Sequence, residues 1–225
     1  MFENETPPQS KRDRTRAAIR AVAIRSLREQ GYDATTMRGI AAEAGLSVGN
    51  AYYHFPTKDH LVQELYLDVQ QEHRTVALPL LADEQDLTAR VGIVVRAGLA
   101  NLTEYHAIAP QFLAAAFTPD SPVNPLSSES TPARDLVLGL FTEAVSGAKQ
   151  QLPRDLADDL PTALWMGYLL LALFWTYDRS PDQARTTKLV DAMLRVLRFA
   201  LPLLRVRPFR LAVTEIVGIV AGRAS

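Results

Sequence analysis

The residues Gly45-Leu46-Ser47-Val48-Gly49 satisfy the pattern G-x-S-x-G, in which the serine hydroxyl can act as a nucleophile. In serine hydrolases that serine stands on a sharp turn directly after a β-strand, so that its hydroxyl is exposed at the edge of a sheet. The same five residues can also form a tight turn between two helices, with Ser47 at the start of the second one. The sequence on either side of the motif distinguishes these two interpretations.

The residues before Ser47 favour a helix and not a strand. Residues 40–44, IAAEA, contain strong helix formers. In the hydrolase fold an acidic residue and then a histidine follow the serine along the chain, and no pattern here predicts the parallel sheet of that fold. The four histidines all lie in the first half of the chain: His54, His60, His73 and His106. We therefore predict no catalytic residue and keep a serine hydrolase using Ser47 only as the alternative.

Local signals around the motif predict two short helices joined by a turn. Apolar residues spaced i, i+3, i+4 and i+7 follow Thr36, which is a suitable N-cap; they are Met37, Ile40, Ala41 and Ala44. Gly45 comes where a left-handed C-terminal residue is needed. Ser47 can cap the next helix by accepting a hydrogen bond from the backbone N–H of Gly49 or Asn50. Pro56 ends that helix, because the residue before a proline is pushed out of the α region.

The rest of the chain also has helical periodicity. An amphipathic first helix is expected over 12–30 and ends at Gly31, and a long fourth helix is expected after an N-cap at Thr57. Further helical runs are expected near Leu87–Tyr105, Ala109–Phe117, Asp135–Ala148, Ala163–Tyr177 and Asp182–Leu201. Residues 118–132 predict an unusually long loop, either mobile or a lid, and the 205–225 tail predicts one more short helix. The fold class is therefore all-α.

Composition limits the kinds of site that the chain can build. The 225 residues include no cysteine, which excludes disulfides and thiolate metal ligands and fits a cytoplasmic location. No histidine or acidic residue lies at i+4 from His54, so neither a metal site nor a cofactor is expected. Residues 11–58 carry nine Lys or Arg against four Asp or Glu, whereas the remainder is acidic. This asymmetry suggests a small module that contacts a polyanion, although it also fits an ordinary solvated face.

One stretch raises the question of a membrane span. Leu160–Tyr177 contains no charged residue, but its 18 residues are at the lower limit for a spanning helix. Pro161 and Thr176 lie near its ends. We expect a buried core helix and no membrane partner.

The stretch TTMRGIAAEAGLSVGNAYYHFPTKDHLVQELY resembles the N-terminal DNA-binding domain of the TetR family of bacterial transcriptional regulators. The resemblance covers roughly residues 12–70. It implies a three-helix domain whose second and third helices form a helix-turn-helix, followed by a larger helical ligand-binding and dimerisation domain. The expected division is a disordered arm over 1–10, a DNA-binding domain over 11–58 and the second domain over 59–225.

The resemblance also implies which residues contact double-stranded DNA. The recognition helix corresponds to Val48–His54, and Val48, Gly49 and Asn50 at its start would face the base edges. Asn50 can pair with adenine, and Val48 can touch a thymine methyl group. The residues expected to contact phosphates are Thr36, Arg38, Tyr52, Tyr53, His54 and Lys58, with Ser47 at the N-terminus of the helix.

Several of these residues have a plainer interpretation as well. Tyr53 and Phe55 can be core residues, and for Phe55 the core is favoured. Gly49 can serve only to let another backbone approach closely. The basic residues between Lys11 and Arg16 fit either a disordered arm near the minor groove or the solvated start of the first helix.

The second domain is expected to form a homodimer. The helix over 182–201 has a wider apolar arc than one core face requires, and pairing the last two long helices across a two-fold axis would bury the excess. A dimer requires a palindromic operator with half-sites about 34 Å apart, or a multiple of that distance.

Aromatic residues of the second domain can line a pocket for a small, largely apolar effector, or can simply form its core. They are Phe112, Phe117, Phe141, Trp165, Met166, Tyr168 and Trp175. The resemblance implies that the effector changes the spacing of two DNA-binding domains and most often releases a repressor. Residues 59–76, continuous with both domains, would transmit that change.

Overall fold

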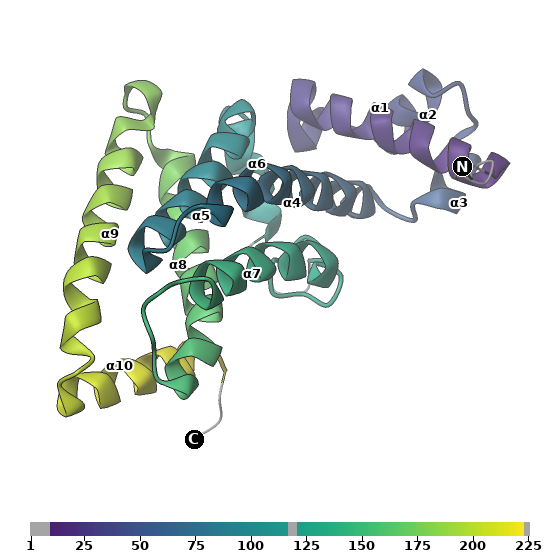
Figure 1. Cartoon of the computed structure of the whole chain (residues 1–225). Helices are drawn as coiled ribbons and strands as arrows, with labels where there is room; N and C mark the ends of the chain where they lie inside the picture. The colour runs from purple at the N-terminus through teal and green to yellow at the C-terminus, as the bar shows by residue number, and fades with distance from the viewer. Residues whose placement is uncertain (1–9, 117–120, 223–225) are drawn as a thin grey trace, which may run out of the picture. The chain divides into compact units, whose positions relative to one another are not determined.

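The computed structural model describes residues 10–116 and 121–222, and within them every regular element is a helix, as predicted (Figure 1). The chain forms two compact units. Of the described residues, unit 1 comprises those within Met1–Tyr66 and Gln111–Ser130, and unit 2 those within Leu67–Pro110 and Thr131–Ser225. The division falls later than the boundary expected after residue 58, because the start of the fourth helix packs with unit 1.

Unit 1 contains the predicted helix-turn-helix. Its helices are α1 (Lys11–Ala34), α2 (Met37–Glu43), α3 (Val48–His54), the first part of α4 (Lys58–Ala82) and most of α6 (Ala109–Ala116). A cluster of nine buried residues lies in its core: Ile19, Val22, Ala23, Met37, Ile40, Ala41, Ala51, Phe55 and Leu61. The hydrophobic contribution of Phe55, which is 1% exposed, is about 1.5–3 kcal/mol.

The two ends of α1 differ from the sequence-based expectation in detail. Ser10 is its N-cap and accepts a hydrogen bond from the backbone N–H of Asp13 at 3.1 Å. The basic residues from Lys11 to Arg16 are therefore helical. Ser10, the last residue of the arm expected over 1–10, caps this helix, and residues 1–9 lie outside the described chain. Gly31, where the helix was expected to end, has φ of +81° and interrupts it, and one further turn follows. This φ favours glycine because other residues rarely adopt it.

Unit 2 is a bundle that continues from α4. Its other elements are α5 (Leu87–Leu102), η1 (Thr103–Tyr105), α7 (Thr131–Ser146), α8 (Arg154–Tyr177), η2 (Pro181–Gln183), α9 (Ala184–Leu203) and α10 (Arg207–Val220). The described part of the long loop, residues 121–130, belongs to unit 1. There the amide of Gln63 in α4 donates to the hydroxyl of the fully buried Ser130 at 3.1 Å.

Helix α8 begins earlier than expected. It starts at Arg154 and contains Pro161, which the sequence pattern places before the helix. By length and composition this helix could cross a membrane, but core helices of soluble proteins have the same properties. Its residues Trp165, Tyr168 and Trp175 lie in the core cluster of unit 2. Only 33% of its apolar window is buried, so α8 is a core helix on one face and not the fully buried helix that was expected.

The tail forms α10, which crosses the N-terminal part of α8 and packs against it (Figure 1). Val217 and Gly218 are its buried residues. A Cβ atom placed at Gly218 would lie 3.6 Å from an oxygen of Asp159 in α8. The tail helix is therefore an integrated part of unit 2.

A buried arginine connects three segments of unit 2. Arg90 of α5 is 5% exposed, and its guanidinium donates to backbone carbonyl oxygens near the C-terminal ends of α4 and α7. The distances are 2.6 Å to Leu81, 2.7 Å to Glu143 and 2.9 Å to Ala144, and a fourth bond reaches Glu84. Helix ends leave carbonyl groups without intrahelical partners, and a cation is favourable there.

Candidate nucleic-acid interface

The turn between α2 and α3 forms from the residues that predicted it. Gly45 has φ of +68°, and its N–H donates to the carbonyl of Ala42 at 3.1 Å, while the N–H of Leu46 donates to Ala41 at 2.9 Å. These two bonds form a Schellman motif at the end of α2. The side chain of Ser47 then accepts a hydrogen bond from the N–H of Asn50 at 3.2 Å. A helix precedes this serine, so its geometry is that of an N-cap and not of a nucleophile elbow.

The Ser47→Ala variant is expected to lose about 1 kcal/mol of unfolding free energy, because Ala cannot satisfy the N–H groups at the start of α3. Urea unfolding at neutral pH measures this loss. Ser47→Asn, which retains a capping side chain, is the control and should stay close to wild type. Equal stability of the alanine variant and the control would contradict a capping role.

Helix α3 presents one face to solvent and the other to the core. Tyr52 and Tyr53 are 48% and 69% exposed, and Val48 is 38% exposed. Ala51 and Phe55 on the opposite face are buried. Tyr53 is thus a surface residue and Phe55 a core residue, which resolves the alternatives left open for them. Within the same helix, Gly49 is exposed, whereas Asn50 and His54 are half-buried.

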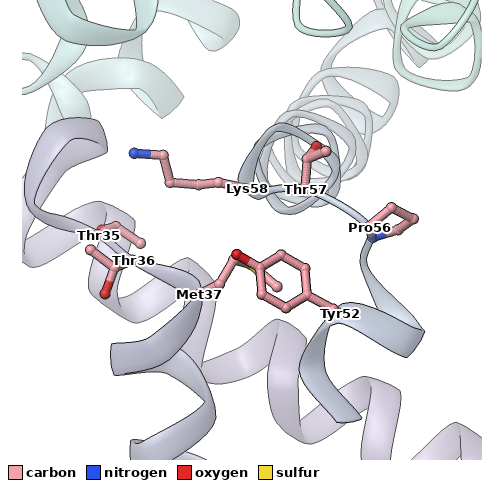
Figure 2. A pocket seen from close by; sticks show the side chains of 7 residues that line it. All are labelled: Thr35, Thr36, Met37, Tyr52, Pro56, Thr57 and Lys58. Atoms are coloured by element: carbon pink, nitrogen blue, oxygen red, sulfur yellow. The ribbon is translucent and has the colours of Figure 1, made fainter. Parts of the chain in front are cut away.

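An open pocket lies beside α3 within unit 1. Figure 2 shows Tyr52 of α3 next to Met37 at the start of α2, with Thr36 beyond Met37 and with Thr57 and Lys58 above them. Thr35 and Pro56 complete the lining. Three of the residues expected to contact phosphates, Thr36, Tyr52 and Lys58, therefore gather around one depression. Arg38 is exposed on α2.

Two of these side chains already have partners inside unit 1. The Thr36 hydroxyl caps α2 by accepting from the N–H of Gly39 at 3.1 Å. The Lys58 ammonium donates to the Tyr32 carbonyl at 2.7 Å and lies 3.8 Å from the centroid of the Tyr32 ring. An ammonium has three donors, so this arrangement leaves capacity for a phosphate oxygen.

Tyr32 links the end of α1 to the start of α4. Its hydroxyl donates to a carboxylate oxygen of Asp59 at 2.6 Å. Burial, followed by the hydrogen bond and negative charge of Asp59, raises the pKa of Tyr32 to about 12. The phenol therefore stays protonated at neutral pH and keeps donating to Asp59.

The residues expected to line an effector pocket do not all lie together. Phe141, Trp165, Tyr168 and Trp175 are buried in the core cluster of unit 2, and Met166 packs against that cluster. Within the described chain, the indole N–H of Trp165 is buried without a hydrogen-bond partner.

The two remaining residues of that set lie elsewhere. Phe112 belongs to unit 1, where its ring contacts Tyr32 edge-on with centroids 6.1 Å apart. Phe117 lies outside the described residues.

A buried histidine next to this aromatic cluster is not among the residues that the sequence pattern singles out. His73 of α4 is 1% exposed, and its ring lies 6.0 Å from that of Tyr168. Its Nε2 is 2.8 Å from the carbonyl oxygen of Val94, which fixes a proton on that nitrogen because a carbonyl only accepts. The signal was present in the sequence: His73 continues a buried i+4 series through Leu65, Val69, Ala77 and Leu81.

Unit 2 is expected to lose stability as the pH falls below about 6.5. Burial lowers the pKa of His73, and the bond to Val94 offsets this only partly. The unfolded chain therefore takes up a proton at a pH where the folded chain does not, so the stabilisation is complete above the unfolded pKa and decreases below it. Urea midpoints between pH 7.5 and 5 measure the trend. A His73→Leu variant should show a flatter profile, and parallel profiles would contradict the assignment.

Comparison with known proteins agrees with this architecture. The family profile described as "Bacterial regulatory proteins, tetR family" matches residues 19–65. The chain is 39% identical over 54 residues to an uncharacterized HTH-type transcriptional regulator of Mycobacterium tuberculosis. That match spans 24% of this chain and only 25% of the relative. It is 30% identical over 95 residues to the nucleoid occlusion factor SlmA of Escherichia coli, spanning 42% of this chain and 46% of SlmA.

Solved structures extend the similarity to most of the fold. A TetR-family regulator from Streptomyces coelicolor superposes with a TM-score of 0.61 at 18% identity, covering 91% of this chain and 88% of that protein. A TetR regulator from Nitrosomonas europaea gives 0.57 at 19% identity, covering 83% and 99%. A second family profile, "Tetracyclin repressor-like, C-terminal domain", matches residues 90–213. This match covers more than half of the chain, so the chain belongs to the TetR family of bacterial regulatory proteins.

Proposed function

We propose that this protein is a dimeric, sequence-specific DNA-binding regulator that acts as a repressor, and that a small and largely apolar ligand releases it from its operator. The observation that carries the proposal is the exposed face of α3, held by the Gly45 turn and the Ser47 cap. A short helix presented in this way fits the DNA major groove. Such a regulator works in the cytoplasm, where the chromosome is.

The contacts divide into those that read bases and those that hold register. Val48, Gly49 and Asn50 start α3 and would meet base edges, with Asn50 as the hydrogen-bonding reader. Tyr52, Tyr53, His54, Arg38 and Lys58 would contact phosphates, together with the helix starts at Thr36 and Ser47. The pocket formed by Thr36, Tyr52 and Lys58 supports this division, because it gathers three polar groups beside the recognition helix.

The exposed surface of α9 supports a homodimer. Val190 of this helix is 2% exposed and faces the core, whereas Val196 and Phe199 are 67% and 73% exposed. Met193 and Leu203 continue the exposed series at helical spacing. On α8, Leu170 and Tyr177 are also more than half exposed. Contiguous apolar surface of this kind marks an interaction site, and pairing α8 and α9 with a second copy would bury it.

The effector proposal rests on the aromatic cluster of unit 2. The unpartnered Trp165 N–H and the His73–Tyr168 contact place polar groups within an apolar environment. Binding sites for small molecules combine an apolar lining with a few such groups. An effector that releases DNA must bind the DNA-incompetent state more tightly, because a ligand with equal affinity for both states shifts nothing.

The deciding experiment selects fragments of genomic DNA on the immobilised full-length protein. Enrichment of a palindromic sequence, with binding that weakens steeply as salt rises, supports the proposal. Light scattering on the selected complex gives the number of chains bound. If no fragment is enriched over random DNA, the proposal fails. Ester hydrolysis lost specifically in Ser47→Ala would instead support the serine hydrolase, although nothing in the geometry of Ser47 favours it.

A further inference from the structure

One carboxylate in α4 lies between two arginines of α1. Arg16 Nη2 is 2.6 Å from one oxygen of Glu64, and Arg20 Nε is 2.9 Å from the other. The side chain of Glu64 is 19% exposed. The two arginines are four residues apart on one helix, so both reach the same partner. Each oxygen of Glu64 thus accepts a charge-assisted hydrogen bond.

Arg16 also reaches the end of the recognition helix. Its Nη1 donates to the carbonyl oxygen of His54 at 3.1 Å, and its guanidinium carbon lies 4.3 Å from the centroid of the Phe55 ring. His54 is the last residue of α3, so its carbonyl lacks an intrahelical partner. A cation at this position also interacts favourably with the helix dipole. Arg16 therefore connects the C-terminal end of α3 to α4 through Glu64.

The recognition helix depends on such contacts because it is short. Helices of about seven residues are not stable on their own in water, and α3 spans Val48–His54. Ser47 caps its first turn, and Ala51 and Phe55 anchor one face in the core. The bond from Arg16 holds its last turn. Losing that bond leaves the angle of the exposed face less well defined, although the core contacts remain.

We propose that Arg16 and Glu64 are positioning residues for sequence recognition. Glu64 orients the Arg16 guanidinium, which in turn fixes the end of α3, so that the base-reading face meets the groove at one angle. This inference rests on the DNA-binding function proposed above. Neither residue needs to touch DNA for the effect, because a precise site depends on the groups that support its contact residues.

A purely electrostatic role makes the opposite prediction. If Arg16 and Arg20 served only as phosphate-binding cations, Glu64 would weaken DNA binding by partly neutralising them. Removing its charge would then tighten binding to every DNA sequence. In the positioning role, the same change weakens binding to the operator and leaves binding to random DNA equal or tighter.

The experiment measures the affinity of full-length Glu64→Gln for the selected operator and for random DNA of equal length. We expect the ratio of operator to random affinity to fall about 5- to 150-fold, the usual range for coupling between two sites. The matched control is Glu29→Gln, the same charge change at an exposed residue of α1, which should leave the ratio unchanged. Hydrogen exchange at the amides of residues 51–55 should become faster only in Glu64→Gln.

A second variant tests the proposal without changing charge. Arg16→Lys keeps the cation but loses the planar group that bonds two partners at once. It should lose operator affinity while retaining the salt dependence of wild type. This variant decides the matter if thermal unfolding shows that Glu64→Gln does not fold.

Two results would overturn the inference: an unchanged affinity ratio in folded Glu64→Gln, or full operator affinity in Arg16→Lys. Failure of the wild-type protein to bind any selected fragment is a different result. It would overturn the proposed function itself.

Discussion

The Arg90→Met variant is expected to lose about 3 kcal/mol of unfolding free energy in unit 2, because two of its carbonyl partners would be left without a donor. Met fills similar space but donates no hydrogen bond. The carbonyls of Glu84 and Ala144 would lose their donor. Those of Leu81 and Glu143 would keep the backbone N–H groups of Glu84 and Gly147 as donors. Against a typical domain stability of about 5–15 kcal/mol, such a loss is a large share of the total.

Urea unfolding followed by circular dichroism measures this loss, and Arg96→Met is the matched control. Arg96 lies on the same helix, but its side chain is 54% exposed and pairs with the 43% exposed Asp191 at 2.7 Å. An exposed pair of this kind contributes about 0–1 kcal/mol. If both methionine variants lost equal stability, the buried bonds of Arg90 would not be responsible.

The Asn50→Ala variant is expected to lose about 1–3 kcal/mol of discrimination per half-site at one base pair, the usual contribution of a bidentate amide–adenine contact. Alanine is the best helix former, so α3 itself should remain folded. Affinity for the operator should fall, whereas affinity for an operator already substituted at that base pair should not. Titrations with both DNA fragments, at one fixed salt concentration, measure the difference.

The control for this prediction is a residue expected to contact phosphate. Arg38→Gln should weaken binding to both fragments alike. It should also reduce the slope of log affinity against log salt concentration by about one per half-site. If Asn50→Ala behaved in this uniform manner too, Asn50 would be a backbone contact, and another residue of α3 would read the bases.

The helix-turn-helix could be predicted because its signals are local. Thr36, Gly45, Ser47 and Pro56 each determine the conformation of their own few residues, through a cap, a positive φ or a steric clash. The structure has α3 with the cap that these signals predict and with the bounds that the family resemblance implies. The predicted start of α8 was wrong, because the usual effect of a proline does not hold there. A proline normally stands at or before the first turn of a helix, yet α8 runs through Pro161.

The contacts that join distant segments could not be predicted in this way. Arg16 and Glu64 are 48 positions apart, and nothing in either neighbourhood indicates the other. Arg90 lies in an apolar run where one charged residue normally indicates a solvent-facing position, yet its guanidinium is buried on backbone carbonyls. Periodicity assigns a residue to a face but does not show which partner that face meets.

The aromatic residues show a second kind of limit. Phe141, Trp165 and Tyr168 have a spacing that fits both a packed core and the wall of a ligand pocket, because both need large apolar side chains on one face. The structure places them in one cluster, whereas Phe112 contacts Tyr32 in unit 1. Amino-acid type alone did not separate these environments.

Two of the places where the chain passes between its units lie inside helices, after Tyr66 in α4 and after Pro110 in α6. A protease that needs an unfolded linker finds none at either crossing. A chimaera that exchanges unit 1 between related proteins must therefore keep the number of residues in α4 unchanged. One inserted residue after Tyr66 would turn the rest of α4 by about 100° about the helix axis relative to the residues before it, so α4 tolerates substitution there far better than a change in length.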